Sequence, residues 1–181
     1  MEPNDTKPPD GITRDLHIRR HHLPHWQMGG SIYFVTFRSR CGDLPESARR
    51  IVVQTLLHNH TKRYDLLLAV VMPDHVHILL CPRQKTPGIW FDLGEIMKGI
   101  KGTSARKINK LMGRKGSIWA EESCDRMIRS EDEYIEKWKY MEHNPVKSGL
   151  ANDPREYEFI VRPDLAGESG EVRDKSVPPT D

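Results

Sequence analysis

The sequence lacks the features of a secreted or membrane-spanning protein. Its three cysteines, Cys41, Cys81 and Cys124, are widely spaced and odd in number, which indicates neither a disulfide framework nor a CxxC zinc site. No apolar run approaches the roughly 18 residues of a membrane span, and the N-terminal segment has no apolar core of a signal peptide. We therefore expect a reduced, cytoplasmic protein that has no membrane partner.

The chain also lacks a strong charge of one sign. Lys and Arg total 28 against 26 Asp and Glu, so the formal net charge over 181 residues is only +2. This balance argues against a protein that binds nucleic acid through bulk charge, although it permits a local basic patch. A hydrophobic content of 36% suffices for one domain, and nine histidines are more than is usual for this length.

Composition divides the chain into three parts. Residues 1–22 are polar and Pro-rich and end in the basic cluster Arg19–His22, so we predict a disordered or loosely docked N-terminal arm that could contact DNA. Residues 164–181 have almost nothing to bury and are predicted to be a disordered tail. A single domain is expected over residues 23–163.

Within this domain, the patterns predict the order strand, helix, two strands, helix, short strands and helix. The predicted elements are a strand over 31–38, a helix after Pro45, a hairpin of strands over 66–72 and 75–80, a helix over 91–112, short strands over 117–119 and 126–129, and a helix from Ser130 to about Asn144, where Pro145 limits it. This order predicts an α+β fold, a ferredoxin-like antiparallel sheet with helices packed on one face.

Two histidines occupy alternate positions of one predicted strand. Because side chains of a strand alternate between faces, His75 and His77 project from the same face and can share a divalent metal. With nine histidines, an HxH pair also arises by chance, so the pair alone does not establish a metal site. His58 and His60 form a second HxH pair at a predicted helix end, where residues two apart diverge, and we expect both to be solvated.

The last predicted helix offers a tyrosine and an asparagine. Tyr134, Trp138 and Met141 form the stripe expected to pack on the sheet, whereas Tyr140 and Asn144 lie together, one turn apart, off that stripe. A tyrosine is a poor nucleophile as a phenol, but a nearby divalent cation can assist it, and an amide oxygen is a suitable ligand for Mg²⁺ or Mn²⁺. Alone, Tyr140 is equally compatible with an ordinary surface tyrosine.

Together these segments resemble a known family. LPHW, SIYFVTFR, VVMPDHVHILL and the stretch from KGTSARK to HNPVKSGL, from Leu23 to Leu150, are similar to the REP-associated tyrosine transposases, within the single-tyrosine HUH transposases of the insertion-sequence-200 type. The resemblance implies that His75, His77 and Asn144 bind Mg²⁺ or Mn²⁺. It also implies that Tyr140 cleaves single-stranded DNA at hairpin-forming repeats through a covalent 5′-phosphotyrosine and transfers the strand. We expect Asp74 to close the turn and orient an imidazole.

A basic segment is the candidate surface for nucleic acid. Between residues 96 and 116 there are seven cations and no acid, a pattern that suits a phosphate backbone. These cations are Lys98, Lys101, Arg106, Lys107, Lys110, Arg114 and Lys115. Thr103 and Ser104 could add neutral hydrogen bonds to phosphates, and Trp119 is expected to pack in the core rather than stack on a base.

Two other functions stay open at this point. The chain could be a DNA- or RNA-hairpin binding protein without chemistry, or a metal-dependent nuclease that uses water as its nucleophile. One basic block and an apparently complete site within one chain slightly favour a monomer over a homodimer.

Overall fold

The computed structural model describes residues 30–163. The predicted arm over residues 1–22, the first residues of the predicted domain, including LPHW, and the tail over 164–181 lie outside these residues. No helix in the described part of the chain is both long and apolar enough to cross a membrane.

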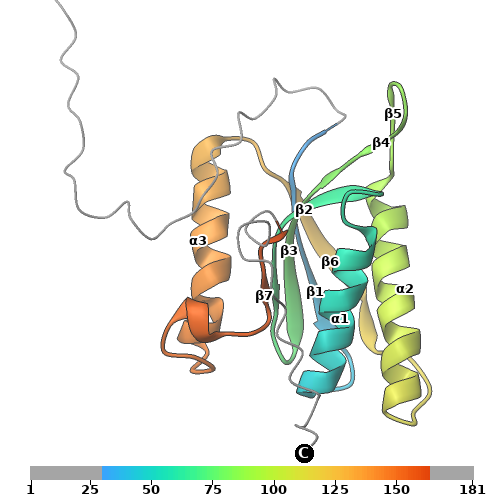
Figure 1. The fold of residues 1–181 in the computed structure, drawn as a ribbon, viewed down its shortest axis with the longest axis vertical. Helices are drawn as coiled ribbons and strands as arrows, with labels where there is room; N and C mark the ends of the chain where they lie inside the picture. The colour runs from blue at the N-terminus through green and yellow to red at the C-terminus, as the bar shows by residue number, and fades with distance from the viewer. Residues whose placement is uncertain (1–29, 164–181) are drawn as a thin grey trace, which may run out of the picture.

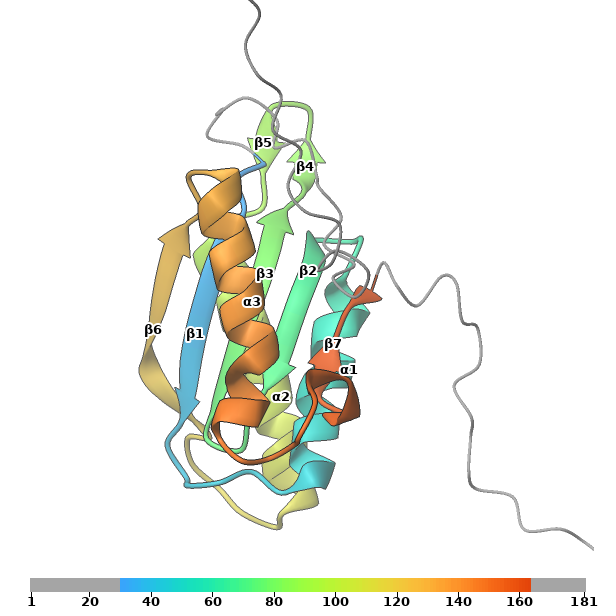
Figure 2. The same cartoon turned by 90° about the vertical axis from the view of Figure 1, so that its left-hand side faces the viewer.

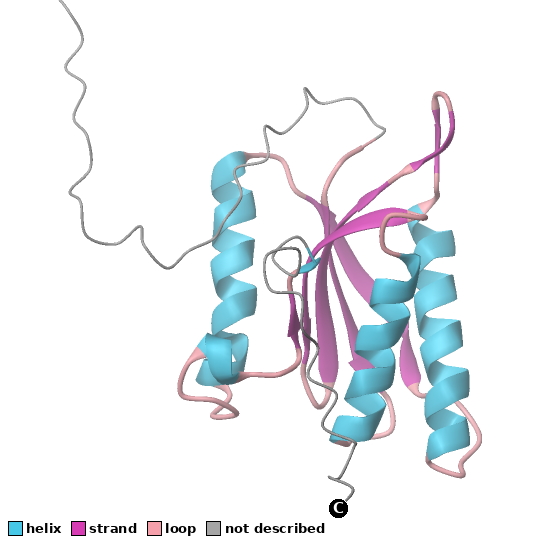
Figure 3. Ribbon diagram, viewed as in Figure 1, coloured by secondary structure: helices cyan, strands magenta, loops and turns pink. Residues whose placement is uncertain are grey.

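One antiparallel sheet organises the molecule (Figure 3). Its five strands run in the order β6-β1-β3-β2-β7, and a separate two-stranded hairpin, β4 and β5, extends from the end of β3 (Figure 1). The strands are β1 (Tyr33–Ser39), β2 (Tyr64–Val71), β3 (His75–Pro82), β4 (Gln84–Thr86), β5 (Ile89–Trp90), β6 (Trp119–Met127) and β7 (Ile160–Val161). The helices are α1 (Glu46–Asn59), α2 (Leu93–Leu111) and α3 (Glu131–Lys147), followed by a short 3₁₀ turn, η1 (Pro154–Glu156).

The three helices cover both faces of the sheet. α1 and α2 pack side by side on one face, and α3 crosses the other (Figures 1 and 2). The antiparallel α+β class is therefore confirmed, but the helices do not all share one face as the order of elements suggested. The order of strands and helices does not determine which face of the sheet each helix covers. The apolar stripe of α3 packs on the face opposite α1 (Figure 2).

Helix ends follow local sequence signals. The side chain of Asp92 accepts a hydrogen bond from the Glu95 N–H at the start of α2, and Ser130 accepts one from the Glu133 N–H at the start of α3. α3 continues past Pro145 to Lys147, whereas the sequence predicted an end near Asn144. Pro145 removes only one hydrogen-bond donor from the last turn, which the helix tolerates so close to its end.

The edge strand β6 also differs from prediction. Two short strands were expected, over 117–119 and 126–129, but one nine-residue strand runs from Trp119 to Met127, with a register shift opposite Phe37–Ser39. Its middle residues are exposed and mostly charged, so they lack the alternation that predicts a strand, and they join the sheet by pairing with β1. β4, β5 and β7 were not predicted because each has only two or three residues.

Candidate active site

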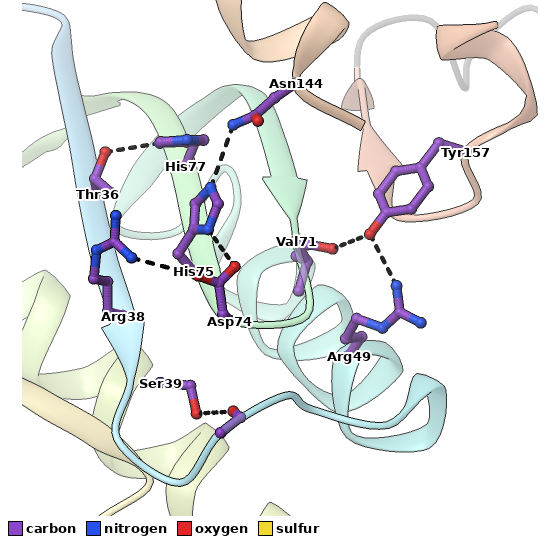
Figure 4. Close-up of polar contacts among 11 residues, drawn as sticks. Thr36, Arg38, Ser39, Arg49, Val71, Asp74, His75, His77, Asn144 and Tyr157 are labelled. Carbon is purple, nitrogen blue, oxygen red and sulfur yellow. Dashed lines mark hydrogen bonds and ion pairs between the residues drawn. The ribbon is translucent and has the colours of Figure 1, made fainter. Parts of the chain in front are cut away.

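The β2–β3 hairpin carries the paired histidines, and it is anchored from three sides. At the turn between the two strands, the Asp74 carbonyl accepts a hydrogen bond from the Ser39 N–H at 2.7 Å. The Pro73 carbonyl accepts one from the Leu44 N–H at 2.8 Å. On the β2 side, the Tyr157 hydroxyl donates to the carbonyl of Val71 at 2.9 Å (Figure 4). Segments far apart in the sequence therefore fix the backbone that precedes His75.

Alternation along β3 places the two histidines on the face beneath α3. The neighbours Val76 and Ile78 point into the opposite, fully buried core. The two imidazole ring centroids are 4.6 Å apart, close enough to face one ligand together. The predicted placement of His75 and His77 on one face is thus what the fold produces.

Each histidine is held through its Nδ1 atom. His77 Nδ1 lies 2.7 Å from Thr36 Oγ1 on β1, and His75 Nδ1 lies 2.6 Å from Asp74 Oδ1. A carboxylate or hydroxyl on Nδ1 fixes the ring orientation and directs Nε2 outward, the arrangement typical of metal-ligating histidines. Asp74 therefore lies where the sequence argument expected it, against an imidazole.

Because both Nδ1 atoms have hydrogen-bond partners, the Nε2 atoms of His75 and His77 are the ring nitrogens that could bind a ligand. His77 Nε2 is buried and has no hydrogen-bond partner, and burial, aided by the charges of His75 and Arg38, lowers the pKa of His77 to about 3. The ring is thus neutral at neutral pH, with a lone pair free to bind a cation. A buried polar atom without a partner is uncommon in folded proteins, and an imidazole nitrogen in this state is available to bind a cation.

Asn144 completes the site from α3. Its side chain is largely buried, and its Nδ2 donates to His75 Nε2 at 3.3 Å. This contact requires a lone pair on His75 Nε2, which places the ring proton on Nδ1 toward Asp74. Turning the amide by half a rotation would present Oδ1 instead, so the residues fit a divalent cation. Among residues 30–163, no three His, Cys, Asp or Glu side chains are grouped so that they could hold a metal ion, and the side chain that faces His75 from α3 is the amide of Asn144.

Tyr140 lies next to this pair and is open to solvent. Its ring centroid is 5.4 Å from that of His77 and 6.4 Å from that of Phe34, and the side chain is 41% exposed. The Lys147 ammonium lies 5.6 Å from the centroid of the Tyr140 ring. Tyr134, in contrast, is buried at 4% exposure against Trp138, as the packing stripe predicted. Of the two tyrosines of α3, only Tyr140 combines exposure with proximity to the histidines.

The seven cations predicted to bind DNA lie elsewhere. They belong to α2 and the turn after it, on the opposite face of the sheet from Tyr140 (Figure 2). Lys98 and Lys101 line a cleft of about 600 Å³ between α2 and β6, and Lys101 donates to the Glu121 carbonyl at 2.9 Å. Arg106, Lys107, Lys110 and Lys115 are exposed, and Arg114 is half-buried.

Four side chains outside the site can also be compared with expectation. Trp119 packs in the core, as predicted, and donates from Nε1 to the Ser104 hydroxyl at 3.0 Å. Ser104 is itself fully buried, so it cannot contact DNA. His58 is exposed as expected, but His60 is half-buried and accepts a hydrogen bond from the Leu66 N–H at 3.0 Å, beside the bulge of β2.

Sequence reasoning missed Thr36 and Arg38, the two β1 side chains beside the histidines. In the register of β1 with β3, Thr36 lies opposite His77 and Arg38 opposite His75. The alternation of SIYFVTFR puts Phe34, Thr36 and Arg38 on one face, but nothing in the sequence gives the register that brings this face to the histidines.

Comparisons with known proteins identify the family to which this chain belongs. The model of the IS200-like transposase family matches residues 44–143, more than half of the chain, and the match includes both histidines and Tyr140. The chain therefore belongs to the IS200-like transposase family. It is accordingly a DNA-processing protein of the transposase class.

A solved transposase structure shares the fold. A REP-associated tyrosine transposase bound to a REP hairpin matches with a TM-score of 0.62 at 20% identity, over 86% of this chain and 95% of that one. A candidate transposase from Deinococcus radiodurans matches over 65% of this chain and 92% of its own at 20% identity, with a TM-score of 0.43. No curated protein matches the sequence.

Proposed function

We propose that this protein cleaves single-stranded DNA and transfers the cut strand, with Tyr140 as the nucleophile and a divalent metal held by His75, His77 and Asn144. The observation that carries the proposal is the pair of imidazoles held through Nδ1, one of whose Nε2 atoms is buried without a partner, directly beside an exposed tyrosine. A protein that only binds hairpins has no need of this arrangement.

The ligand set is neutral, which suits a phosphodiester substrate. Two imidazoles and one amide leave the full charge of a Mg²⁺ or Mn²⁺ ion available. When bound, such an ion offsets negative charge on the phosphate and polarises its phosphorus. Thr36 and Asp74 keep both imidazoles in place, and Asp74 stays ionised. Although partial burial raises the pKa of Asp74, the hydrogen bond and charge of His75 outweigh this effect and lower it.

The proposed reaction exchanges one phosphodiester for another. The Tyr140 oxygen loses its proton and forms a bond to phosphorus, the bond from phosphorus to the 3′ oxygen breaks, and that oxygen takes up a proton. The products are a 5′-phosphotyrosine on Tyr140 and a free 3′-OH. Strand transfer reverses the step with the 3′-OH of another strand, so no external energy source is required.

The proposed substrate is a hairpin-forming DNA repeat. The solved transposase with the same fold is bound to a REP hairpin, and we extend that class of ligand to this chain. The cations of α2 are proposed to contact the hairpin backbone on one face, while the strand to be cut reaches Tyr140 on the other. Because His75, His77, Tyr140 and Asn144 come from one chain, a monomer can form the site.

The test uses labelled single-stranded hairpin DNA with Mn²⁺ and looks for a covalent protein–DNA adduct on a denaturing gel. We expect wild type to form the adduct, and both EDTA and Tyr140→Phe to abolish it. Tyr33→Phe is the matched control, because Tyr33 is a half-buried tyrosine of β1 whose side chain points away from the histidine face. It should react as wild type does.

Two outcomes would replace the proposal. Cleavage that survives Tyr140→Phe would indicate a nuclease that uses water. Hairpin binding by wild type without any cleavage would indicate a binding protein.

A further inference from the structure

Arg38 is an unassigned cation at the edge of the candidate site. It lies on β1 directly opposite His75, and its guanidinium extends toward Asp74, with Nη1 3.4 Å from Asp74 Oδ2 (Figure 4). Its side chain is 69% exposed.

A structural role explains little of this placement. The contact with Asp74 is long and exposed, and exposed ion pairs of this kind contribute about 0–1 kcal/mol to stability. A guanidinium has five N–H donors in a planar fork, and this contact uses one of them. Two adjacent donors of such a fork match the oxygens of a phosphate, and the exposure of the side chain leaves them accessible.

The charges at the site indicate what the Arg38 cation could stabilise. The three proposed metal ligands are neutral, whereas Asp74 places one negative charge next to the position of an anionic phosphate. Attack by the Tyr140 oxygen on a phosphodiester monoanion adds negative charge at phosphorus. A fixed cation beside Asp74 both cancels the carboxylate and stabilises that developing charge.

We infer that Arg38 is a further catalytic residue, which donates to a non-bridging oxygen of the scissile phosphate. This inference rests on the proposed function. Removing one such donor lowers the rate of reaction by about 10²–10³-fold in other enzymes. Arg38→Ala should therefore slow adduct formation by about 100-fold. Arg38→Lys should recover part of the loss, because it restores the charge but not the fork.

The experiment measures adduct formation on two hairpins that differ only at the scissile linkage, which is either a phosphodiester or an uncharged methylphosphonate. Mn²⁺ affinity is measured in parallel by electron paramagnetic resonance. Arg83→Ala is the control, because Arg83 makes a similar exposed ion pair, with Asp65, near the other end of β3. We expect the difference between wild type and Arg38→Ala to shrink to within about threefold on the methylphosphonate, and Mn²⁺ affinity to be unchanged.

Each other result overturns the inference. An equal loss on both hairpins with weakened Mn²⁺ binding would mean that Arg38 only orients Asp74 and His75. Wild-type rates in Arg38→Ala would mean that it has no role in the reaction. If wild type itself forms no Tyr140-dependent adduct on the phosphodiester, the proposed function fails first, and that failure is distinguishable from the failure of Arg38 alone.

Discussion

The two faces of the sheet differ in what they bury, and β3 shows the contrast residue by residue. On the face toward α1 and α2, Val76, Ile78 and Leu80 are fully buried in a continuous apolar core. On the face toward α3, His75 and His77 alternate with them and bring polar groups, one of them without a partner. One strand thus contributes to the apolar core on one side and carries the proposed metal ligands on the other.

This difference indicates that stability and ligand binding are separable in the molecule. The face toward α1 and α2 excludes water and carries the apolar burial that favours folding. The face toward α3 tolerates a buried imidazole with an unsatisfied atom, which costs free energy in the absence of a ligand. Substitutions at neighbouring positions of β3 should therefore lower either the stability of the fold or the affinity for metal. The first two of the following predictions test this, and the third concerns the surface of α2.

The largest effect on stability is expected from the core face. Ile78→Ala leaves a cavity beneath α1 and α2 and should lower the free energy of unfolding by about 3 kcal/mol, measured by urea denaturation. Mn²⁺ affinity of the folded fraction should stay at the wild-type value, because His77 projects from the other side. A parallel loss of Mn²⁺ affinity would show that the two faces are coupled.

The site face should respond to metal instead. At a free Mn²⁺ concentration of about 100 times Kd, binding should raise the free energy of unfolding of wild type by about 2.7 kcal/mol, and EDTA should reverse the gain. His77→Gln should lose this gain, because the substitution removes the imidazole ring and with it the buried ring nitrogen of His77. His58→Gln, at the exposed end of α1, should keep it. A gain of the same size in His77→Gln would place the metal elsewhere.

The smallest effect is expected on the outer surface of α2. Lys107→Gln should reduce the dependence of hairpin affinity on salt by about 0.9 in the slope of log K against log[salt], as for the loss of one phosphate contact. Binding isotherms at several KCl concentrations measure the slope. Lys62→Gln, an exposed lysine between α1 and β2, is the control and should leave the slope unchanged. An unchanged slope in Lys107→Gln would remove this residue from the proposed DNA surface.

Periodicity predicted the parts of the fold that have strong local patterns. The β2–β3 hairpin, the three helices and the orientation of His75 and His77 follow from alternation and helical spacing, and all are present. The separation of Tyr134 from Tyr140 followed from the packing stripe in the same way. In these cases, the residues that determine the structure are near one another in the sequence.

What could not be predicted depends on contacts between distant segments. Packing, and not the local sequence, determines the register that places Thr36 opposite His77. Packing also determines which face of the sheet α3 covers. β6 was divided in two because its exposed residues show no alternation. Ser104 looked available to DNA because its pattern on α2 is that of a polar helix, yet its hydroxyl serves the Trp119 indole.

The hydrogen bond from Tyr157 to Val71 has a consequence for biosynthesis. It joins the end of β2 to a residue made 86 positions later, and Asn144 similarly reaches back 69 positions to His75. A ribosome therefore releases the histidine hairpin long before the residues that complete and brace it. The nascent chain cannot assemble this candidate site until Asn144 has been translated, and it cannot brace the hairpin until Tyr157 has followed.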